Sequence, residues 1–386
     1  MEKINLGIIG IGNMGASHAK KIFEGQCPDF ILTAVADTNP DRLVWAKETF
    51  GDAVKCFATA EEMLDSGCVN ACIVAVPHFD HVKYAIECMK RSIHVLVEKP
   101  AGVYTKQVRE MNAEADKHPE VVFAMMFNQR TNHIYRKLKE LIASGDYGQI
   151  RRVNWIITDW YRPQAYYDSG AWRATWSGEG GGALLNQCPH QLDLLQWLCG
   201  LPAKVHAFCH EGKWHDVEIE DDVTAYLEFP NGATGVFVTT TGDAPGTNRL
   251  EITGTRGRLV CENDVLTFDK LEMDERAWCR VCKEGFRKPE CERIVVETDG
   301  ANPQHVGVMN AFAAAIADRK NPLVADGREG IHGLMLSNAI HLSAWTGETV
   351  TLPIDERKFY DLLMERCRTS RHKADSDVTM DTAGSY

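Results

Sequence analysis

The sequence contains no long hydrophobic run. None of its apolar stretches reaches the roughly 18 consecutive residues that a membrane-spanning helix requires. Residues 1–4 lead directly into a predicted strand, which leaves no room for a signal peptide. Apolar residues make up 44% of the chain and charged residues 25%, the composition of ordinary soluble domains. We therefore expect a globular protein of the cytoplasm that has no membrane partner.

Basic residues are fewer than acidic residues. The 386 residues include 42 Lys and Arg against 54 Asp and Glu, so the formal net charge is −12. A chain of this charge repels polyanions, which argues against a nucleic-acid partner. Its length favours two domains, each with a core of its own.

Cysteine is plentiful, with 13 residues, but closely paired cysteine motifs are nearly missing. Cys279 and Cys282 have the spacing of a CxxC pair, and Cys291 follows them without a second pair. A structural zinc site needs four ligands, usually from two close pairs. We therefore expect no metal site, and cysteines that are reduced and mostly buried.

A glycine-rich turn near the N-terminus is the most informative feature that is present. Residues 5–9 are a short apolar run that predicts a buried strand, and a helical stretch, 16–23, follows the turn. Between them Gly10, Gly12 and Gly15 have the GxGxxG spacing of a dinucleotide-binding loop. The first glycine permits a tight turn, the second lets the backbone approach a pyrophosphate, and the third lets helix and strand pack closely.

The residues around this turn complete a predicted nucleotide site. Asn13 and Met14 lie at the start of the helix, whose N-terminal N–H groups and dipole favour a phosphate. Asp37 ends the second apolar run, 30–36, where its carboxylate can accept hydrogen bonds from the ribose hydroxyls. Because the same charge repels a 2′-phosphate, we expect NAD as the cofactor in preference to NADP.

The pattern of elements changes about a third of the way along the chain. Over residues 1–128 apolar strands alternate with helices, which predicts an α/β Rossmann domain with a parallel sheet. Over residues 129–365 strands separated by turns dominate, which predicts an α+β domain on a mostly antiparallel sheet. The last segment, 369–386, is polar, and we expect it to be disordered.

Polar residues follow several strands of the first domain. Pro77 and His78 follow one strand, Glu98 and Lys99 the next, and Asn128 the last. Because ligands bind at the carboxyl ends of parallel strands, we expect all five near the cofactor. Lys99 should project toward the nicotinamide end, where its ammonium group can donate to a substrate oxygen and burial can lower its pKa.

A second polar cluster lies at residues 180–193. Three glycines open it, and Asn186, His190 and Asp193 then recur at helical spacing, so we expect them on one helix face. Asn186 can orient a hydroxyl, and His190 can accept its proton near neutral pH. Two questions stay open. Asp193 either holds the imidazole of His190 or caps a helix contact. His190, which has leucines as neighbours, can instead be a core residue with satisfied hydrogen bonds.

Together these motifs resemble the Gfo/Idh/MocA oxidoreductases, which include inositol dehydrogenases and many sugar dehydrogenases. The resemblance rests on three segments, Gly10-x-Gly12-x-x-Gly15, Glu98-Lys99-Pro100 and Gly182-x-x-x-Asn186-x-x-x-His190. It implies a Rossmann domain followed by a domain with a large open sheet, whose face commonly forms oligomer interfaces. It also implies that Lys99 and His190 are the catalytic pair and that the substrate lies between the domains.

The sequence departs from the pattern of this family at two positions. Asn186 stands where the family often has aspartate. The amide lacks the charge that would raise the basicity of the histidine, so we expect Asn186 to position the substrate. His78 stands where an asparagine often follows the proline, which makes a cofactor contact there less certain.

An aromatic and basic stretch precedes the second cluster and includes Trp160, Arg162, Trp172 and Arg173. Aromatic faces stack on sugars and a guanidinium can bind an oxygen or a phosphate, although such rings can also simply cover a sheet. Beside the sugar site that the resemblance implies, they favour a carbohydrate or glycoside. The expected substrate-binding residues are Lys99, Trp160, Arg162, Trp172, Arg173, Asn186 and His190.

These expectations combine into an NAD-dependent dehydrogenase that oxidises a secondary hydroxyl of a sugar, polyol or glycoside. Two other functions stay open, a glycosidase that keeps NAD bound as a redox relay and a non-catalytic NAD-binding regulator. The presence of both Lys99 and His190 argues against the regulator. The expected partners are a small-molecule substrate and further copies of the chain, as a homodimer or homotetramer.

Overall fold

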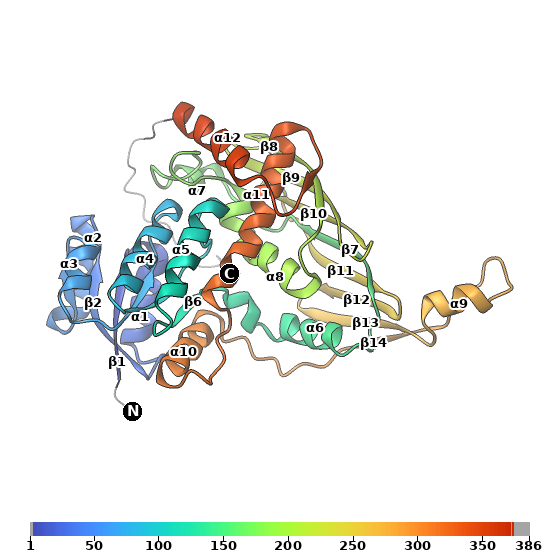
Figure 1. Ribbon diagram of the computed structural model, residues 1–386, viewed down its shortest axis with the longest axis horizontal. Coiled ribbons are helices and arrows are strands. Elements are labelled where there is room, and N and C mark those ends of the chain that lie inside the picture. The colour runs from blue at the N-terminus through green and yellow to red at the C-terminus, as the bar shows by residue number, and fades with distance from the viewer. Residues whose placement is uncertain (1–2, 372, 374–386) are drawn as a thin grey trace.

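The computed structural model describes residues 3–371 and residue 373. It contains two sheets, one in each half of the molecule, with helices between and around them (Figure 1). A parallel sheet in the N-terminal half and a mixed sheet in the second half confirm the predicted fold class, an α/β Rossmann domain followed by an α+β domain.

Six parallel strands form the first sheet, in the order β3-β2-β1-β4-β5-β6. They are β1 (Ile4–Ile9), β2 (Phe30–Ala36), β3 (Lys55–Phe57), β4 (Ala71–Val74), β5 (His94–Val97) and β6 (Phe123–Met125). The sequence does not reveal β3, because its three residues are too few to show a hydrophobic pattern.

Helices cover both faces of this sheet, which explains why its strands are almost wholly apolar. Their caps follow from the local sequence: Asn39 accepts a hydrogen bond at the start of α2, and Thr59 with Glu62 forms a capping box at α3. One face carries α1 (Asn13–Phe23) and α2 (Pro40–Phe50), and the other carries α3 (Ala60–Asp65), α4 (His81–Lys90) and α5 (Thr105–Lys117).

One further helix, α10 (Gln304–Ala317), returns to the first domain from far along the chain. Its buried Val308 and Phe312 share a core with α1 and α2, and the ring of Phe312 lies 6.1 Å from that of Phe30. A predicted boundary near residue 128 assigns this helix to the second domain. The core of the first domain is therefore built from two separate parts of the sequence.

The second sheet has nine strands in the order β14-β13-β12-β11-β7-β10-β9-β8-β15. Only β7 and β10 pair in parallel among these neighbours, so the predicted, mostly antiparallel sheet is confirmed. The strands are β7 (Ile150–Ile157), β8 (Lys204–Glu211), β9 (Glu220–Glu228), β10 (Thr234–Thr240), β11 (Asn248–Gly254), β12 (Gly257–Glu262), β13 (Val265–Leu271), β14 (Cys291–Val295) and β15 (Val350–Thr351).

The helices of the second domain lie on the side of this sheet that faces the first domain (Figure 1). They include α6 (His133–Ala143), the short α7 (Gln164–Asp168), α8 (Pro189–Cys199) and α11 (Gly330–Thr346), with α12 (Glu356–Thr369) beyond them. Within the described chain no helix covers the opposite side of the sheet. Residues 272–290, which include α9 (Glu275–Val281), project from the end of β13 and β14 as an arm.

The predicted disordered tail, 369–386, lies outside the described residues at position 372 and from 374 onward. Its first residues instead contact the second domain. Helix α12 extends to Thr369, Ser370 donates a hydrogen bond to Glu218, and the Lys373 Nζ donates to the Tyr167 carbonyl at 2.7 Å. A carboxylate and a backbone carbonyl of the second domain thus bind the start of this segment, and the disorder expected for the segment as a whole stays a prediction.

No helix over residues 3–371 has the length and apolar character needed to cross a bilayer. In the same part of the chain no three His, Cys, Asp or Glu side chains lie together in a way that could hold a metal ion.

Helix α8 is held in place by a buried arginine. Arg130, which follows β6, donates two hydrogen bonds to the carboxylate of Asp193 on α8, at 2.8 and 2.7 Å. A third bond of 2.7 Å links Arg130 to Glu329, next to the start of α11. Both side chains of the Arg130–Asp193 pair are almost inaccessible to solvent. Because a charge buried without its partner is costly, this pair fixes α8 against the turn that follows β6.

Replacing Asp193 with Ala should lower the free energy of unfolding by about 3–5 kcal/mol, since it leaves Arg130 buried with one carboxylate instead of two. Urea unfolding followed by circular dichroism measures the change. The control is Asp361→Ala, which removes an exposed partner of Arg357 on α12 and should cost less than about 1 kcal/mol. Equal losses for the two variants would contradict this account of α8.

Candidate active site

The glycine turn has the geometry that its spacing predicts. Gly10 adopts φ +85°, and a Cβ on Gly15 would lie 1.9 Å from the carbonyl oxygen of Gly10, so neither position accepts a side chain. A Cβ on Gly12 would meet only the Arg42 guanidinium, at 3.5 Å. The backbone at Gly12 is therefore open on the side from which a pyrophosphate would approach.

The surroundings of the turn also fit a dinucleotide. No side chain caps α1, whose first turn contains Asn13 and Met14, so the end of the helix suits a phosphate. Asp37, which follows β2, accepts hydrogen bonds from the backbone N–H groups of Ile11 and Asn39, at 2.8 and 2.9 Å. These bonds orient the carboxylate beside the turn and leave each oxygen a further lone pair for a ribose hydroxyl.

Glu98 and Lys99 follow β5 and have different environments. Glu98 is buried, and its carboxylate lies 2.6 Å from the Nε2 of His18. Burial raises the pKa of Glu98, but the contact with His18 outweighs it and brings that pKa down to about 2. A second bond, from the backbone N–H of Lys99 at 3.1 Å, ties the carboxylate to its own turn. Glu98 thus stays ionised and anchors Lys99.

Lys99 connects the two domains. Its Nζ donates to the backbone carbonyl of Asn186 at 2.9 Å. Burial lowers the pKa of Lys99, Glu98 opposes this shift, and the guanidinium groups of Arg173 and Arg162 lower the pKa further. Since an ammonium group offers three donors and one is used here, two remain for a ligand.

His190 lies near the N-terminus of α8 and close to Lys99. Burial and the positive charge of Lys99 hold the pKa of His190 well below its usual range. The ring as a whole is half-buried, and its Nδ1 is buried without a hydrogen-bond partner among the described residues. The structure therefore brings together a neutral imidazole and a desolvated lysine, one from each domain.

The predicted single helix face of Asn186, His190 and Asp193 is wrong for Asn186. Asn186 lies in a π-helical turn, Ala183–Gln187, which precedes α8 and is separated from it at Cys188. Asp193 pairs with Arg130, so of the two alternatives it does not hold the imidazole of His190.

The π-helical turn has a physical cause at its N-terminal end. The buried carboxylate of Glu220, on β9, accepts hydrogen bonds from the backbone N–H groups of Gly182 and Leu184 at 2.8 and 2.9 Å. A Cβ on Gly182 would lie 2.0 Å from the carbonyl oxygen of Glu220, so only glycine allows this approach. Helical spacing in the sequence cannot show such a contact with a distant strand.

The aromatic stretch gathers around the hydroxyl of Tyr166. That oxygen accepts hydrogen bonds from Arg173 at 2.7 Å, from Gln187 at 3.2 Å and from the Nδ2 of Asn186 at 3.3 Å. The guanidinium of Arg173 also lies between the rings of Tyr166 and Trp172. Arg162 and Trp160 are part of the same cluster, since the Arg162 guanidinium lies 5.4 Å from the centre of the Trp160 ring.

Three predicted cofactor residues lie at the carboxyl edge of the first sheet. Pro77 precedes a short 3₁₀ helix, His78–Asp80, and His78 is buried with its Nδ1 3.0 Å from the carbonyl oxygen of Glu179 in the second domain. Burial holds the pKa of His78 well below its usual range. Asn128 is buried and donates to Gln304 at the start of α10.

The sequence does not reveal Glu179. This buried carboxylate accepts hydrogen bonds from the Nδ2 of Asn186 and, at 2.7 Å, from the backbone N–H of Ala174. Burial raises its pKa to about 7, against the opposing effect of Arg173. Its only sequence signal is a charged residue inside a glycine run, 178–182, which predicts a solvated turn rather than a buried carboxyl group.

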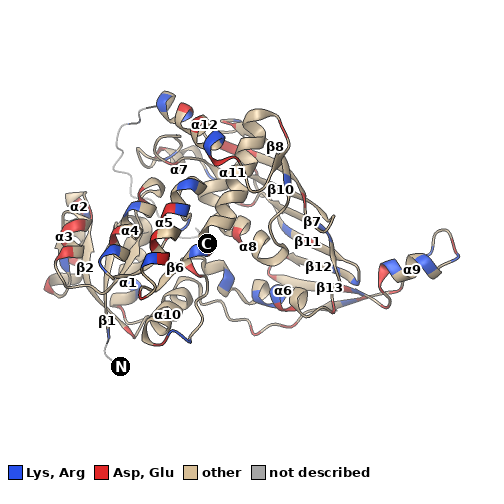
Figure 2. Ribbon diagram, in the orientation of Figure 1, with Lys and Arg blue, Asp and Glu red and all other residues tan. Residues whose placement is uncertain are grey.

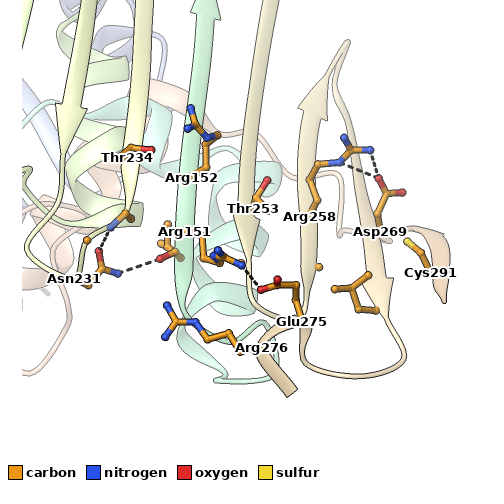
Figure 3. Close-up of a pocket in the computed structure, with 16 residues that line it drawn as sticks. Arg151, Arg152, Asn231, Thr234, Thr253, Arg258, Asp269, Glu275, Arg276 and Cys291 are labelled. Atoms are coloured by element: carbon orange, nitrogen blue, oxygen red, sulfur yellow. Dashed lines mark hydrogen bonds and ion pairs between the residues drawn. The ribbon is translucent and has the colours of Figure 1, made fainter. Parts of the chain in front are cut away.

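A pocket of the described chain lies away from these residues. It measures about 630 Å³ and lies at one end of β7, β11, β12 and β13 (Figure 3). Ion pairs of Arg151 with Glu275 and of Arg258 with Asp269 line it, and none of the predicted site residues does. Its walls offer no pairing of an acid and a base like that of Lys99 and His190.

Comparison with known proteins agrees with both halves of the structure. The NAD-binding Rossmann fold of an oxidoreductase family, the GFO/IDH/MocA family, matches residues 4–126, and the C-terminal domain of the same family matches residues 135–260. The chain belongs to the Gfo/Idh/MocA family. It is therefore an NAD-binding oxidoreductase, and the predicted cofactor is confirmed.

Individual Gfo/Idh/MocA relatives cover most of the chain. The myo-inositol 2-dehydrogenase of Thermotoga maritima is 27% identical over 266 residues, which are 67% of this chain and 75% of the relative. The levoglucosan dehydrogenase of Pseudarthrobacter phenanthrenivorans is 26% identical, over 67% of this chain and 74% of its own length.

A solved structure of a dehydrogenase has a similar fold over most of the chain. The WlbA dehydrogenase from Bordetella pertussis, in complex with NADH and UDP-GlcNAcA, is 28% identical to this chain. Its TM-score is 0.75, and the match covers 92% of this chain and 100% of the solved one.

Two glycine variants separate the fold of the nucleotide turn from its function. Gly15→Ala should lower the free energy of unfolding by about 1–3 kcal/mol, because the new methyl group overlaps a backbone oxygen. Gly12→Ala should fold normally, because its methyl group has space, yet bind NADH at least about tenfold more weakly, a loss of about 1.4 kcal/mol. Urea unfolding and NADH fluorescence titration measure the two effects. Wild-type NADH affinity in Gly12→Ala would contradict the assignment.

Proposed function

We propose that this oxidoreductase is a dehydrogenase that oxidises a secondary hydroxyl of a sugar, polyol or glycoside. The observation that carries the proposal is the junction of Lys99 and His190, from different domains, next to a dinucleotide-binding turn. The inositol and levoglucosan dehydrogenases among its relatives act on compounds of this class by name. The half-buried rings of Trp160, Tyr166 and Trp172 support a sugar, because aromatic faces pack against its C–H bonds.

Each polar group has a proposed role in this reaction. His190 accepts the hydroxyl proton at Nε2, since its Nδ1 is enclosed, and its lowered pKa keeps it in the neutral, basic form. Lys99 donates to the same oxygen and stabilises its developing negative charge. Asn186 orients the substrate through its Oδ1, since its Nδ2 is bonded to Tyr166 and Glu179. Bound NAD supplies the hydride acceptor.

The remaining predicted residues hold the cofactor in this proposal. Gly10, Gly12, Asn13, Met14 and Gly15 surround the pyrophosphate, and Asp37 binds the ribose. The edge residues Pro77, His78, Glu98, Lys99 and Asn128 then lie along the nicotinamide half, as their places after the strands suggest.

Net formation of NADH tests the proposal and separates it from the two alternatives. Purified protein with excess NAD is given a panel of sugars, inositols and glycosides, while absorbance at the NADH band is followed. A dehydrogenase should form about one NADH for each molecule of substrate oxidised. A redox-relay glycosidase would cleave a glycoside without net NADH, and a regulator would do neither. No NADH from any compound, and no reduction of cofactor carried through purification, would contradict the proposal.

We further propose that the chain associates with copies of itself through the uncovered side of the second sheet. Ile156 on β7, Tyr226 on β9 and Phe208 on β8 are exposed there, and the register through β10 places all three on one face. The arm, which follows β13 near the other edge of this sheet, adds an exposed Val281 and a fully exposed Phe286. Large apolar groups on an uncovered face favour association.

Sedimentation velocity at micromolar concentration should give a dimer or a tetramer for the wild type. The double variant Phe208→Ser, Tyr226→Ser should shift the protein toward the monomer, because it removes the two largest apolar groups of that face. The control is Val44→Ser, which removes an exposed apolar side chain of α2 on the first domain. A wild-type monomer would contradict the proposed association.

A further inference from the structure

Three cationic side chains meet at the proposed substrate site. Arg162 and Arg173 lie close enough to Lys99 that both guanidinium groups depress the pKa of its amino group. All three side chains are half-buried, so their charges are only partly screened by water. A cluster of positive charge is unexpected in a chain whose net charge is −12.

Neither arginine has a carboxylate partner among the described residues. Arg173 donates to the hydroxyl of Tyr166, and Arg162 donates to the backbone carbonyl of Tyr161 at 3.0 Å. Arg130 and Arg258, in contrast, each pair with an aspartate. A neutral phenol or carbonyl does not balance a guanidinium charge, so Arg162 and Arg173 retain unused N–H donors together with uncompensated charge.

Aromatic rings fix both guanidinium groups in place. Arg173 lies 4.5 Å from the ring centres of Tyr166 and Trp172, and Arg162 lies 5.1 Å from that of Tyr166. Stacking of this kind holds a guanidinium plane without using its in-plane donors. Both guanidinium groups are therefore held in place against the ring of Tyr166 before a ligand binds. This lowers the entropy cost of binding a ligand there.

Two carboxyl groups act on this cluster, Glu98 on Lys99 and Glu179 with Arg173, and neither neutralises the arginines, because Glu98 is held by His18. Glu179 is buried, and its two oxygens already accept hydrogen bonds from Asn186 and from the backbone N–H of Ala174. Because burial raises its pKa to about 7, part of the Glu179 population is uncharged at neutral pH. The excess of positive charge at the site is left for a ligand.

We infer that the substrate carries an anionic oxygen group, a carboxylate or a phosphate, which Arg162 and Arg173 bind while Lys99 and His190 act on a hydroxyl of the same molecule. This inference rests on the proposed dehydrogenase function and names its substrate class more closely. Bidentate recognition by a guanidinium fork suits either anion, and a neutral sugar would leave two arginines uncompensated beside Lys99.

Binding to the NADH-loaded protein tests this inference without turnover. Isothermal titration at low salt compares D-glucose, D-glucuronate, D-galacturonate, glucose 1-phosphate and a UDP-linked uronate. At least one anionic sugar should bind at least about tenfold more tightly than the neutral one, equivalent to about 1.4 kcal/mol. This advantage should shrink as salt rises, because ions screen charge. The uronates and the phosphate distinguish the two anions.

Variants of the arginines identify the anion site. In Arg173→Gln and in Arg162→Gln, the anionic sugar should lose most of its tighter binding relative to D-glucose, while the affinity for NADH stays unchanged. Arg173→Lys should retain part of the tighter binding of the anionic sugar. The matched control is Arg357→Gln, which removes an exposed guanidinium of α12. Thermal unfolding shows whether each variant is folded.

Two results of the binding experiments would overturn the inference. Either no anionic sugar binds more tightly than D-glucose, or Arg173→Gln, Arg173→Lys and Arg357→Gln all retain the full preference for the anionic sugar. A failure of the dehydrogenase proposal gives a different result. In that case no compound yields NADH, whichever sugar binds. NADH formed equally well from neutral and acidic sugars would refute the anion site alone.

Discussion

The hydrogen bond from the Nζ of Lys99 to the backbone carbonyl of Asn186 is the contact on which the candidate active site depends. It joins the end of β5, in the nucleotide-binding domain, to the turn that precedes His190. That turn is held by Glu220, and the helix after it by the Arg130–Asp193 pair. The two proposed reacting groups therefore reach each other only because three buried carboxylates, Glu98, Asp193 and Glu220, fix the segments that carry them.

The electrostatics of the site follow from the same burial. Desolvation and positive neighbours lower the pKa values of both Lys99 and His190, whereas desolvation raises that of Glu179. Each shift moves a group toward its neutral form. A site of this kind keeps a basic imidazole available and concentrates its remaining charge on Arg162 and Arg173, which do not lose their protons. Perturbed pKa values in one cluster are typical of functional sites.

The sequence predicts those parts of the fold whose signal is local. The parallel strands, the glycine turn and Asp37 were predictable because strand, turn and helix follow one another within about 35 residues. It does not predict the return of α10 to the first domain, since that helix is separated from its partners by most of the chain. Asn186 was assigned to a helix face because spacing cannot show the π-helical turn that Glu220 stabilises. Glu179 was missed since its environment, and not its position in the sequence, makes it unusual.

Single-turnover hydride transfer, with cofactor saturating and pH varied, tests most directly whether His190 is the base. The ordinary pKa of histidine is about 6.5, and that of His190 is lowered below it, so His190 stays deprotonated at and above that pH. In the wild type the rate of oxidation should therefore fall on the acid side only below about pH 6.5. His190→Ala should be slower by about two to four orders of magnitude and lose this acid limb, with NADH affinity unchanged. The control His118→Ala removes a surface histidine at the end of α5 and should match the wild type. Hydride transfer at the wild-type rate in His190→Ala across neutral pH would show that His190 is a core residue, which contradicts the account.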